Sequence, residues 1–232
     1  MTRATVFSGL FVLLAAIVTS PATAVERPFN GKDLSGWTTK QPASRSHWAV
    51  GTATLDLAAP TQLDFKKRGH QLVNASEHGV DIYTNAKYGD VVIELEVMVP
   101  KQSNSGIYVM GEYEVQVLDS YGRKKVGRGD MGAIYGVAAP RVNACKAPGE
   151  WQTYRIDFRA PRFDNQGKKI ANARFVQVVL NGKVILKNLE MHDHCPGDLA
   201  GKEVPRGPLL FQGNHGEVAF RNIRITPRKP GR

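Results

Sequence analysis

The chain lacks a helical pattern. Among its 232 residues, no segment repeats apolar residues at the three- and four-residue spacing of an amphipathic helix over three turns. This absence excludes helix bundles and the folds in which helices alternate with strands. Internal repeats and low-complexity tracts are also missing, which excludes repeat architectures and leaves no linker after the N-terminal segment.

Long hydrophobic runs are scarce as well. The only extended one covers residues 6–18, follows Arg3 and precedes the small residues Ala22-Thr23-Ala24. This arrangement predicts a signal peptide over residues 1–24, which is removed to leave a single domain over residues 25–232. The run falls short of the roughly 20 residues that a membrane-spanning helix needs, so we expect no stable membrane insertion. The expected location is secreted or periplasmic.

Acidic residues are fewer than basic ones, and the formal net charge is +10. The excess lies in short, scattered runs without interleaved aromatics, such as Lys66-Lys67-Arg68 and Arg123-Lys124-Lys125. Such runs are typical of solvated loops rather than of a nucleic-acid surface. Together with the predicted export, this pattern predicts no nucleic-acid partner.

Cysteine is nearly absent. The two residues present are Cys145 and Cys195. In an oxidising compartment an even number predicts a disulfide, here closing a loop of about 50 residues. Metal ligation is the alternative, because Cys195 directly follows His192, Asp193 and His194, although this spacing matches no standard zinc motif.

What the chain has in abundance is strand signals. Residues 91–99 alternate apolar and acidic side chains, and residues 106–110 and 114–118 form two apolar runs separated by a short turn. Residues 175–180 lead into Asn181-Gly182, a strong hairpin signal. Many short strands with turns between them predict an all-β fold, an antiparallel two-sheet sandwich with one concave face for a ligand.

Polar side chains interrupt one of these strands at two-residue spacing. Because residues i and i+2 of a strand share a face, Glu114 and Gln116 should project side by side. A solvent-facing strand is the simpler explanation. The surrounding motifs, taken in their order along the chain, favour a functional site.

These motifs are Pro28-Phe29-Asn30-Gly31-Lys32-Asp33-Leu34-Ser35-Gly36-Trp37, Trp48-Ala49-Val50, Tyr88-Gly89-Asp90, Asn104-Ser105-Gly106-Ile107, Tyr113-Glu114-Val115-Gln116-Val117-Leu118-Asp119, Gly132-Ala133-Ile134-Tyr135, Pro148-Gly149-Glu150-Trp151, Asn181-Gly182, Gly207-Pro208, Phe211-Gln212 with His215-Gly216, and Phe220-Arg221-Asn222-Ile223.

This ordered set closely resembles the 3-keto-disaccharide hydrolase family, formerly a domain of unknown function, over residues 28–227. The resemblance implies a jelly-roll sandwich of the concanavalin A-like lectin/glucanase type. It also implies an exported hydrolase that cleaves 3-keto-glycosides supplied by a sugar 3-oxidoreductase, and it leaves the oligomeric state open. Residues 61–77 depart from the family pattern, whereas Gln212 and His215 still match it.

A C3 ketone acidifies the hydrogen on C2, so cleavage can proceed by proton abstraction and elimination, followed by hydration. This route requires a general base, a stabiliser for the enolate oxygen and an acid for the leaving group. The expected catalytic residues are Glu114, His215 and Asp119. An apolar neighbourhood would raise the pKa of Glu114, and His215 has a suitable ordinary pKa for proton transfer.

Five further residues are expected to bind substrate, namely Asn104, Gln116, Gln212, Trp151 and Arg221. Simpler roles remain open for several candidates: Asn104 as a turn cap, Asp119 as an acceptor of backbone N–H groups, and Trp151 as a core residue. Arg221 belongs either to the site or outside it. No cofactor is required by a fixed motif, and a divalent metal ion that would stabilise an enolate is left open.

Two other functions compete with cleavage of 3-keto-glycosides. A carbohydrate-binding lectin-like domain on the same fold would need amides and aromatics but no carboxylate with a shifted pKa. An ordinary glycoside hydrolase would need two carboxylates about 5–10 Å apart, for which the strands offer no matched pair. The combination of Glu114, Asp119 and His215 therefore favours the 3-keto-glycoside enzyme.

Overall fold

The computed structural model describes residues 24–228. The predicted signal peptide therefore lies outside the described residues, except for its last residue. Among the residues that are described, no helix is long and apolar enough to cross a membrane.

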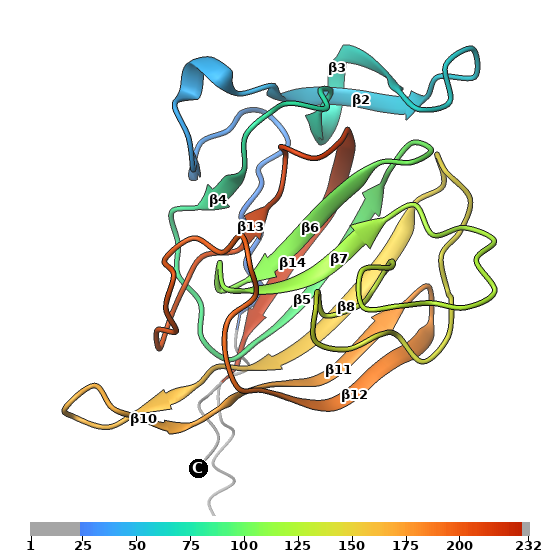
Figure 1. Ribbon diagram of the computed structural model, residues 1–232. Helices are drawn as coiled ribbons and strands as arrows, with labels where there is room; N and C mark the ends of the chain where they lie inside the picture. The colour runs from blue at the N-terminus through green and yellow to red at the C-terminus, as the bar shows by residue number, and fades with distance from the viewer. Residues whose placement is uncertain (1–23, 229–232) are drawn as a thin grey trace, which may run out of the picture.

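Two antiparallel sheets face each other and form the body of the molecule (Figure 1). The smaller has five strands in the order β1-β4-β13-β6-β7, and the larger has seven in the order β12-β11-β8-β5-β14-β3-β2. The single short helix in the described range is a 3₁₀ turn, η1 (Ala43–Arg45). The strands are β1 (Trp37–Thr39), β2 (Trp48–Leu55), β3 (Leu63–Asn74), β4 (Ile82–Thr84), β5 (Val91–Met98), β6 (Asn104–Val109), β7 (Tyr113–Leu118), β8 (Gln152–Arg159), β9 (Arg162–Phe163), β10 (Lys169–Ala171), β11 (Ala173–Leu180), β12 (Lys183–Met191), β13 (Leu210–Phe211) and β14 (Val218–Pro227).

The predicted fold class is confirmed: the protein is an all-β jelly-roll sandwich of two antiparallel sheets. The two-residue alternation explains why the sheets stack. In β5 the apolar Ile93 and Leu95 are buried in the core, whereas Glu94 between them is exposed on the outer face of the large sheet.

Aromatic rings connect the two sheets. Phe211 of β13 stacks on Phe220 of β14, with ring centroids 3.8 Å apart, and on Trp37 of β1 at 5.3 Å. Trp37 and Trp48 are both buried. Because large aromatic side chains bury the most area, this stack anchors the small sheet on the large one.

The two predicted hairpins are present. Strands β6 and β7 pair antiparallel across the turn at residues 110–112, and β11 pairs with β12 across Asn181-Gly182. Asn181 and Gly182 have φ values of 50° and 77°, the left-handed conformation that this tight hairpin turn requires.

Two sequence-based expectations fail. Lys66-Lys67-Arg68 is exposed but lies within β3 and not in a loop. The predicted disulfide is absent, since Cys145 and Cys195 are both free thiols. The N–H of Cys195 bonds the carbonyl of Glu112 before β7, whereas Asn143, two residues before Cys145, bonds Ser120 beyond the far end of β7. A six-residue strand spans about 20 Å, far beyond the roughly 7 Å between Cα atoms that a disulfide tolerates.

Candidate active site

The hairpin of β6 and β7 carries a row of polar side chains on the outer face of the small sheet. Its register sets Gly106 opposite Gln116 and Tyr108 opposite Glu114. The residues between them, such as Ile107 and Val115, belong to the core. The two-residue period therefore forces the polar residues onto the opposite face.

Glu114 is almost completely buried on this face, with 3% of its surface exposed. Gly106 makes room for it: a Cβ atom at position 106 would lie 2.3 Å from Oε1 of Glu114. Since real Cβ atoms do not approach an oxygen this closely, a larger residue at position 106 would have to displace the carboxyl group. The position of Glu114 thus depends on a glycine in the neighbouring strand.

Burial raises the pKa of Glu114 to about 7. The phenol of Tyr108 lies 2.9 Å from Oε2 of Glu114 and 3.0 Å from the carbonyl of Pro196, and its hydrogen bond opposes the rise in the pKa of Glu114. The nearby Asp81 carboxyl adds to the rise. A carboxyl group with this pKa can take and return a proton near neutral pH.

Three amide side chains surround this carboxyl group. Nε2 of Gln116 donates to Oδ1 of Asn104 at 2.9 Å. The Oε1 atoms of Gln116 and Gln212 are buried, and neither accepts a hydrogen bond from any residue in the described range. Because buried amide oxygens are normally paired, these two acceptors are suited to hydroxyl groups of a ligand.

The row opens into a cavity of about 200 Å³. Its lining contains five of the predicted site residues, and four others were not predicted. The predicted residues are Asn104, Glu114, Gln116, Gln212 and His215, and the others are Tyr108, Tyr135, Pro196 and Gly197.

His215 borders a second cavity of about 540 Å³ on its other side, lined also by His78, Gln102 and Glu217. The His215 side chain is exposed, and its Nδ1 hydrogen-bonds Oδ1 of Asn214. An imidazole between two cavities is placed to act on a bond that joins groups bound on either side.

Of the four missed residues, Tyr108 lies in β6 and the other three come from loops. Tyr135 is 40% exposed, and its N–H bonds the carbonyl of Glu114 at 3.1 Å, which places its segment along the free edge of β7. Pro196 and Gly197 belong to the loop after β12. The motif Gly132-Ala133-Ile134-Tyr135 is the one sequence signal that pointed to any of these three.

Asp81 is a further residue that the sequence analysis did not identify. It is buried before β4, accepts the N–H of Gly213 at 3.1 Å and lies 3.7 Å from Nζ of Lys40. Burial raises the pKa of Asp81, whereas Gly213, Lys40 and His215 oppose the rise. An acidic residue between Val80 and Ile82 was the available signal. Asp81 fixes the turn that carries Gln212 and His215.

Asp119 does not line the cavity. Its carboxylate accepts the backbone N–H groups of Gln102 at 3.0 Å and Tyr121 at 3.2 Å. This is the capping role that the sequence left open for it.

Trp151 and Arg221 also lie away from the cavity. The guanidinium of Arg221 lies 4.0 Å from the ring centre of Trp151 and forms an ion pair with Glu96. Trp151 packs on an apolar cluster that includes Met98, on the outer face of the large sheet. The two residues are therefore on the opposite side of the sandwich from Glu114.

Comparison with solved structures supports the fold. A candidate glycosyl hydrolase from Parabacteroides distasonis ATCC 8503 is 30% identical with a TM-score of 0.64, over 89% of this chain and 86% of that one. A second candidate glycosyl hydrolase from the same organism is 17% identical with a TM-score of 0.61, over 88% of this chain and 94% of that one. Among curated proteins, none matches the chain.

The family is shown by the sequence itself. The model of the 3-keto-alpha-glucoside-1,2-lyase-like domain matches residues 25–226, nearly the whole described range and most of the chain. The protein therefore belongs to the 3-keto-alpha-glucoside-1,2-lyase-like domain family.

Proposed function

We propose that the protein cleaves glycosides whose sugar carries a ketone at C3. Its family and the 30% identical candidate glycosyl hydrolase support an enzyme that acts on glycosides. The observation that carries the narrower proposal is the buried carboxyl group of Glu114, the one acidic side chain among the residues lining the smaller cavity, set among amide oxygens that lack partners. One proton-transfer group beside several hydroxyl acceptors suits removal of a C2 proton.

In the first step, the ionised Glu114 takes the proton from C2, and the electrons of the C2–H bond form an enolate with the C3 oxygen. The enolate then reforms the ketone while the bond between C1 and the glycosidic oxygen breaks. This leaves a double bond between C1 and C2. Gln116 and Gln212 would accept hydrogen bonds from sugar hydroxyls and hold the ring against Glu114.

The leaving oxygen needs a proton as the C1–O bond breaks. His215 stands between the two cavities and is the titratable group best placed to supply it. The smaller cavity would hold the keto sugar and the larger one the departing group. Tyr135, an exposed aromatic at the rim of the smaller cavity, would cover one face of the ring.

Addition of water across the new double bond, with OH to C1 and H to C2, completes a net hydrolysis. The protonated Glu114 can return its proton to C2 in this step, while His215, which has given its proton to the leaving group, takes the proton that water loses as its OH adds to C1. The substrate requires an oxidation at C3, so a sugar 3-oxidoreductase would act before this enzyme. Secretion or location in the periplasm, given the predicted signal peptide, is part of the same proposal.

The test compares 3-keto-glucosides with their unoxidised parents as substrates for the wild-type protein and for Glu114→Gln. We expect release of the leaving group from the keto compounds alone, and a loss of at least about 1,000-fold in kcat for Glu114→Gln because the base is removed. Product analysis by mass would distinguish the unsaturated sugar from the hydrated one.

Glu94→Gln is the matched control, since Glu94 lies on β5 at the exposed outer face of the large sheet. It should retain wild-type turnover. Full activity of a folded Glu114→Gln protein would refute the role of Glu114. Cleavage of the unoxidised parents would refute the keto specificity, and binding of all compounds without cleavage would instead favour a lectin-like domain.

A further inference from the structure

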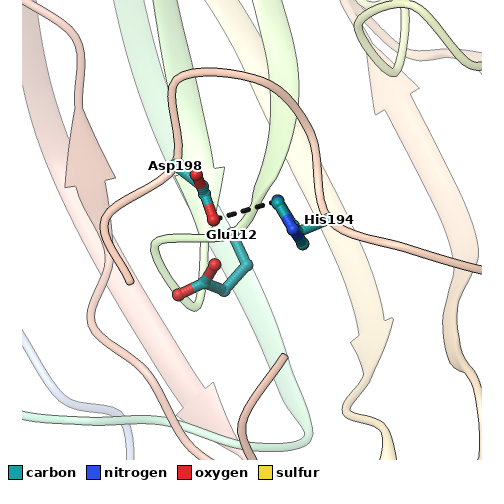
Figure 2. A group of neighbouring side chains, drawn as sticks. All are labelled: Glu112, His194 and Asp198. Carbon is teal, nitrogen blue, oxygen red and sulfur yellow. Dashed lines mark ion pairs between the residues drawn. The ribbon is translucent and has the colours of Figure 1, made fainter. Parts of the chain in front are cut away.

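A second group of titratable side chains lies next to the cavity, at the turn between β6 and β7. Figure 2 shows Glu112, from this turn, converging with His194 and Asp198, from the loop after β12. One ligand atom from each residue lies within 4.8 Å of the others. None of these three residues lines the cavity that contains Glu114.

The cluster has unmet polar atoms. Glu112 is only 1% exposed, and its buried Oε2 has no hydrogen-bond partner within residues 24–228. Nδ1 of His194 and Oδ2 of Asp198 lie 3.0 Å apart, the ion-pair contact drawn as a dashed line in Figure 2, but without hydrogen-bond geometry. Buried polar atoms are rarely left without a hydrogen bond. We therefore expect Oε2 of Glu112, Nδ1 of His194 and Oδ2 of Asp198 to share a bound partner.

The charges favour a cation as that partner. The carboxyl groups of buried Glu112 and half-buried Asp198 lie close together, and they repel each other when both are ionised. A divalent ion would satisfy all three atoms and neutralise both carboxylates.

We propose that Glu112, His194 and Asp198 bind a first-row divalent transition metal ion, with zinc as the best-matched ion. One imidazole nitrogen and two carboxylate oxygens form a ligand set that suits zinc, and the ligand count leaves a position for a water molecule. At metal–ligand distances of about 2.0–2.2 Å and tetrahedral angles, ligand atoms lie about 3.3–3.6 Å apart, so the side chains would move together by up to about 1.5 Å on binding the ion. Magnesium and calcium prefer oxygen ligands alone.

The metal would fasten the loop that covers Glu114. Within this loop the N–H of Cys195 bonds the carbonyl of Glu112, and the carbonyl of Pro196 lies 3.0 Å from the phenol of Tyr108. A Cβ atom on Gly197 would lie 2.8 Å from that phenol oxygen, so the loop touches the side chain that bonds Glu114. The site therefore positions the cavity wall, and it does not depend on the ketone chemistry.

The test is metal binding by the purified protein after treatment with a chelator. We expect about one zinc ion per chain by elemental analysis and calorimetry, together with a higher unfolding temperature when zinc is added. His194→Ala should weaken zinc binding by about 100-fold or more and abolish the thermal shift. Magnesium and calcium should produce no comparable shift.

The matched control is His192→Ala. His192 precedes the same loop, is exposed and contacts Asn172 rather than the cluster, so this variant should bind zinc as the wild type does. If His194→Ala does not fold, Asp198→Asn provides the same comparison with a smaller change. Absence of zinc binding in the wild type, or equal affinity in the ligand variants and the wild type, would overturn the proposal.

Discussion

At the scale of single residues, the environment of Glu114 depends on what its neighbours lack. Gly106 has no side chain, so the carboxyl group fits against β6, and Gln116 bonds Asn104 instead of Glu114. Among the described side chains, Tyr108 is the one that donates a hydrogen bond to this carboxyl group. Substitutions at Gly106 and Tyr108 can therefore test the position of the Glu114 carboxyl group and its pKa independently.

The position is tested by Gly106→Ala. The added methyl group would overlap Oε1 of Glu114, so the carboxyl group must move, and we expect kcat to fall at least about tenfold with little loss of fold. Gly127→Ala is the control, because its Cβ atom would lie 3.7 Å from its nearest neighbour, an ordinary contact. Steady-state kinetics on a 3-keto-glucoside measure both variants. Unchanged kcat in Gly106→Ala would show that the fit of the carboxyl group does not matter.

The pKa is tested by Tyr108→Phe. Glu114 must be ionised to accept a proton, so kcat/KM should rise with pH through about 7 in the wild type. The Tyr108 hydrogen bond lowers the pKa of Glu114, and its removal should therefore shift this rise to higher pH. A pH–rate profile of each protein measures the shift. A rise at the same pH, or at a lower one, would contradict the assignment of Glu114 as the base.

At the scale of elements, the sequence predicts the strands better than the loops. The alternation in residues 113–118 is sufficient to place Glu114 and Gln116 together on one face, because a strand has a fixed period. The loop residues Pro196 and Gly197 follow no period. Their position over Glu114 results from contacts with Lys40, whose Nζ donates to the carbonyls of Gly197 and Asp198 at 2.7 Å each.

Lys40→Met tests how this loop is held. Loss of two charge-assisted hydrogen bonds should lower the local stability of the loop by roughly 1–3 kcal/mol for each bond. The loop should then open to solvent more often. Faster hydrogen exchange in residues 194–199 and a higher KM are the expected results. Lys87→Met, at an exposed lysine away from the cavity, is the control. Equal exchange in the two variants would mean that Lys40 does not hold the loop.

At the scale of the whole molecule, the fold follows from the pattern, but the composition of the site follows only in part. The two-residue period and the Asn181-Gly182 turn predict a sandwich, and strand pairing then gathers Asn104, Gln116 and Glu114. The period cannot tell which of the two outer faces a residue takes. Trp151 and Arg221 consequently lie on the face opposite the predicted site. Asp81 lies at the site because β4, which follows it, pairs with β13 in the small sheet. No local sequence pattern predicts this pairing.

Acid stability is a property of the whole molecule, and Asp90 is its best single probe. The Asp90 carboxylate is 1% exposed at the start of β5 and accepts hydrogen bonds from Arg162, Arg159 and the N–H of Ala160. Burial alone would raise the pKa of Asp90, but these bonds outweigh it and hold the pKa below its ordinary value. At pH values above about 4, the pKa of Asp90 in the unfolded chain, the ionised Asp90 therefore stabilises the folded state. This stabilisation is lost as the pH falls through the lower pKa that Asp90 has in the folded state.

Asp90→Asn should lower the free energy of unfolding at pH 7 by about 3 kcal/mol, because Arg159 and Arg162 lose the charge that they surround. Urea denaturation at several pH values measures this difference. The gap between wild type and variant should narrow below about pH 4, because the unfolded wild-type chain then binds a proton at Asp90 and the folded protein does so only at lower pH. A gap that stays constant down to pH 3 would mean that shape and hydrogen bonding, and not the charge of Asp90, hold these strands together.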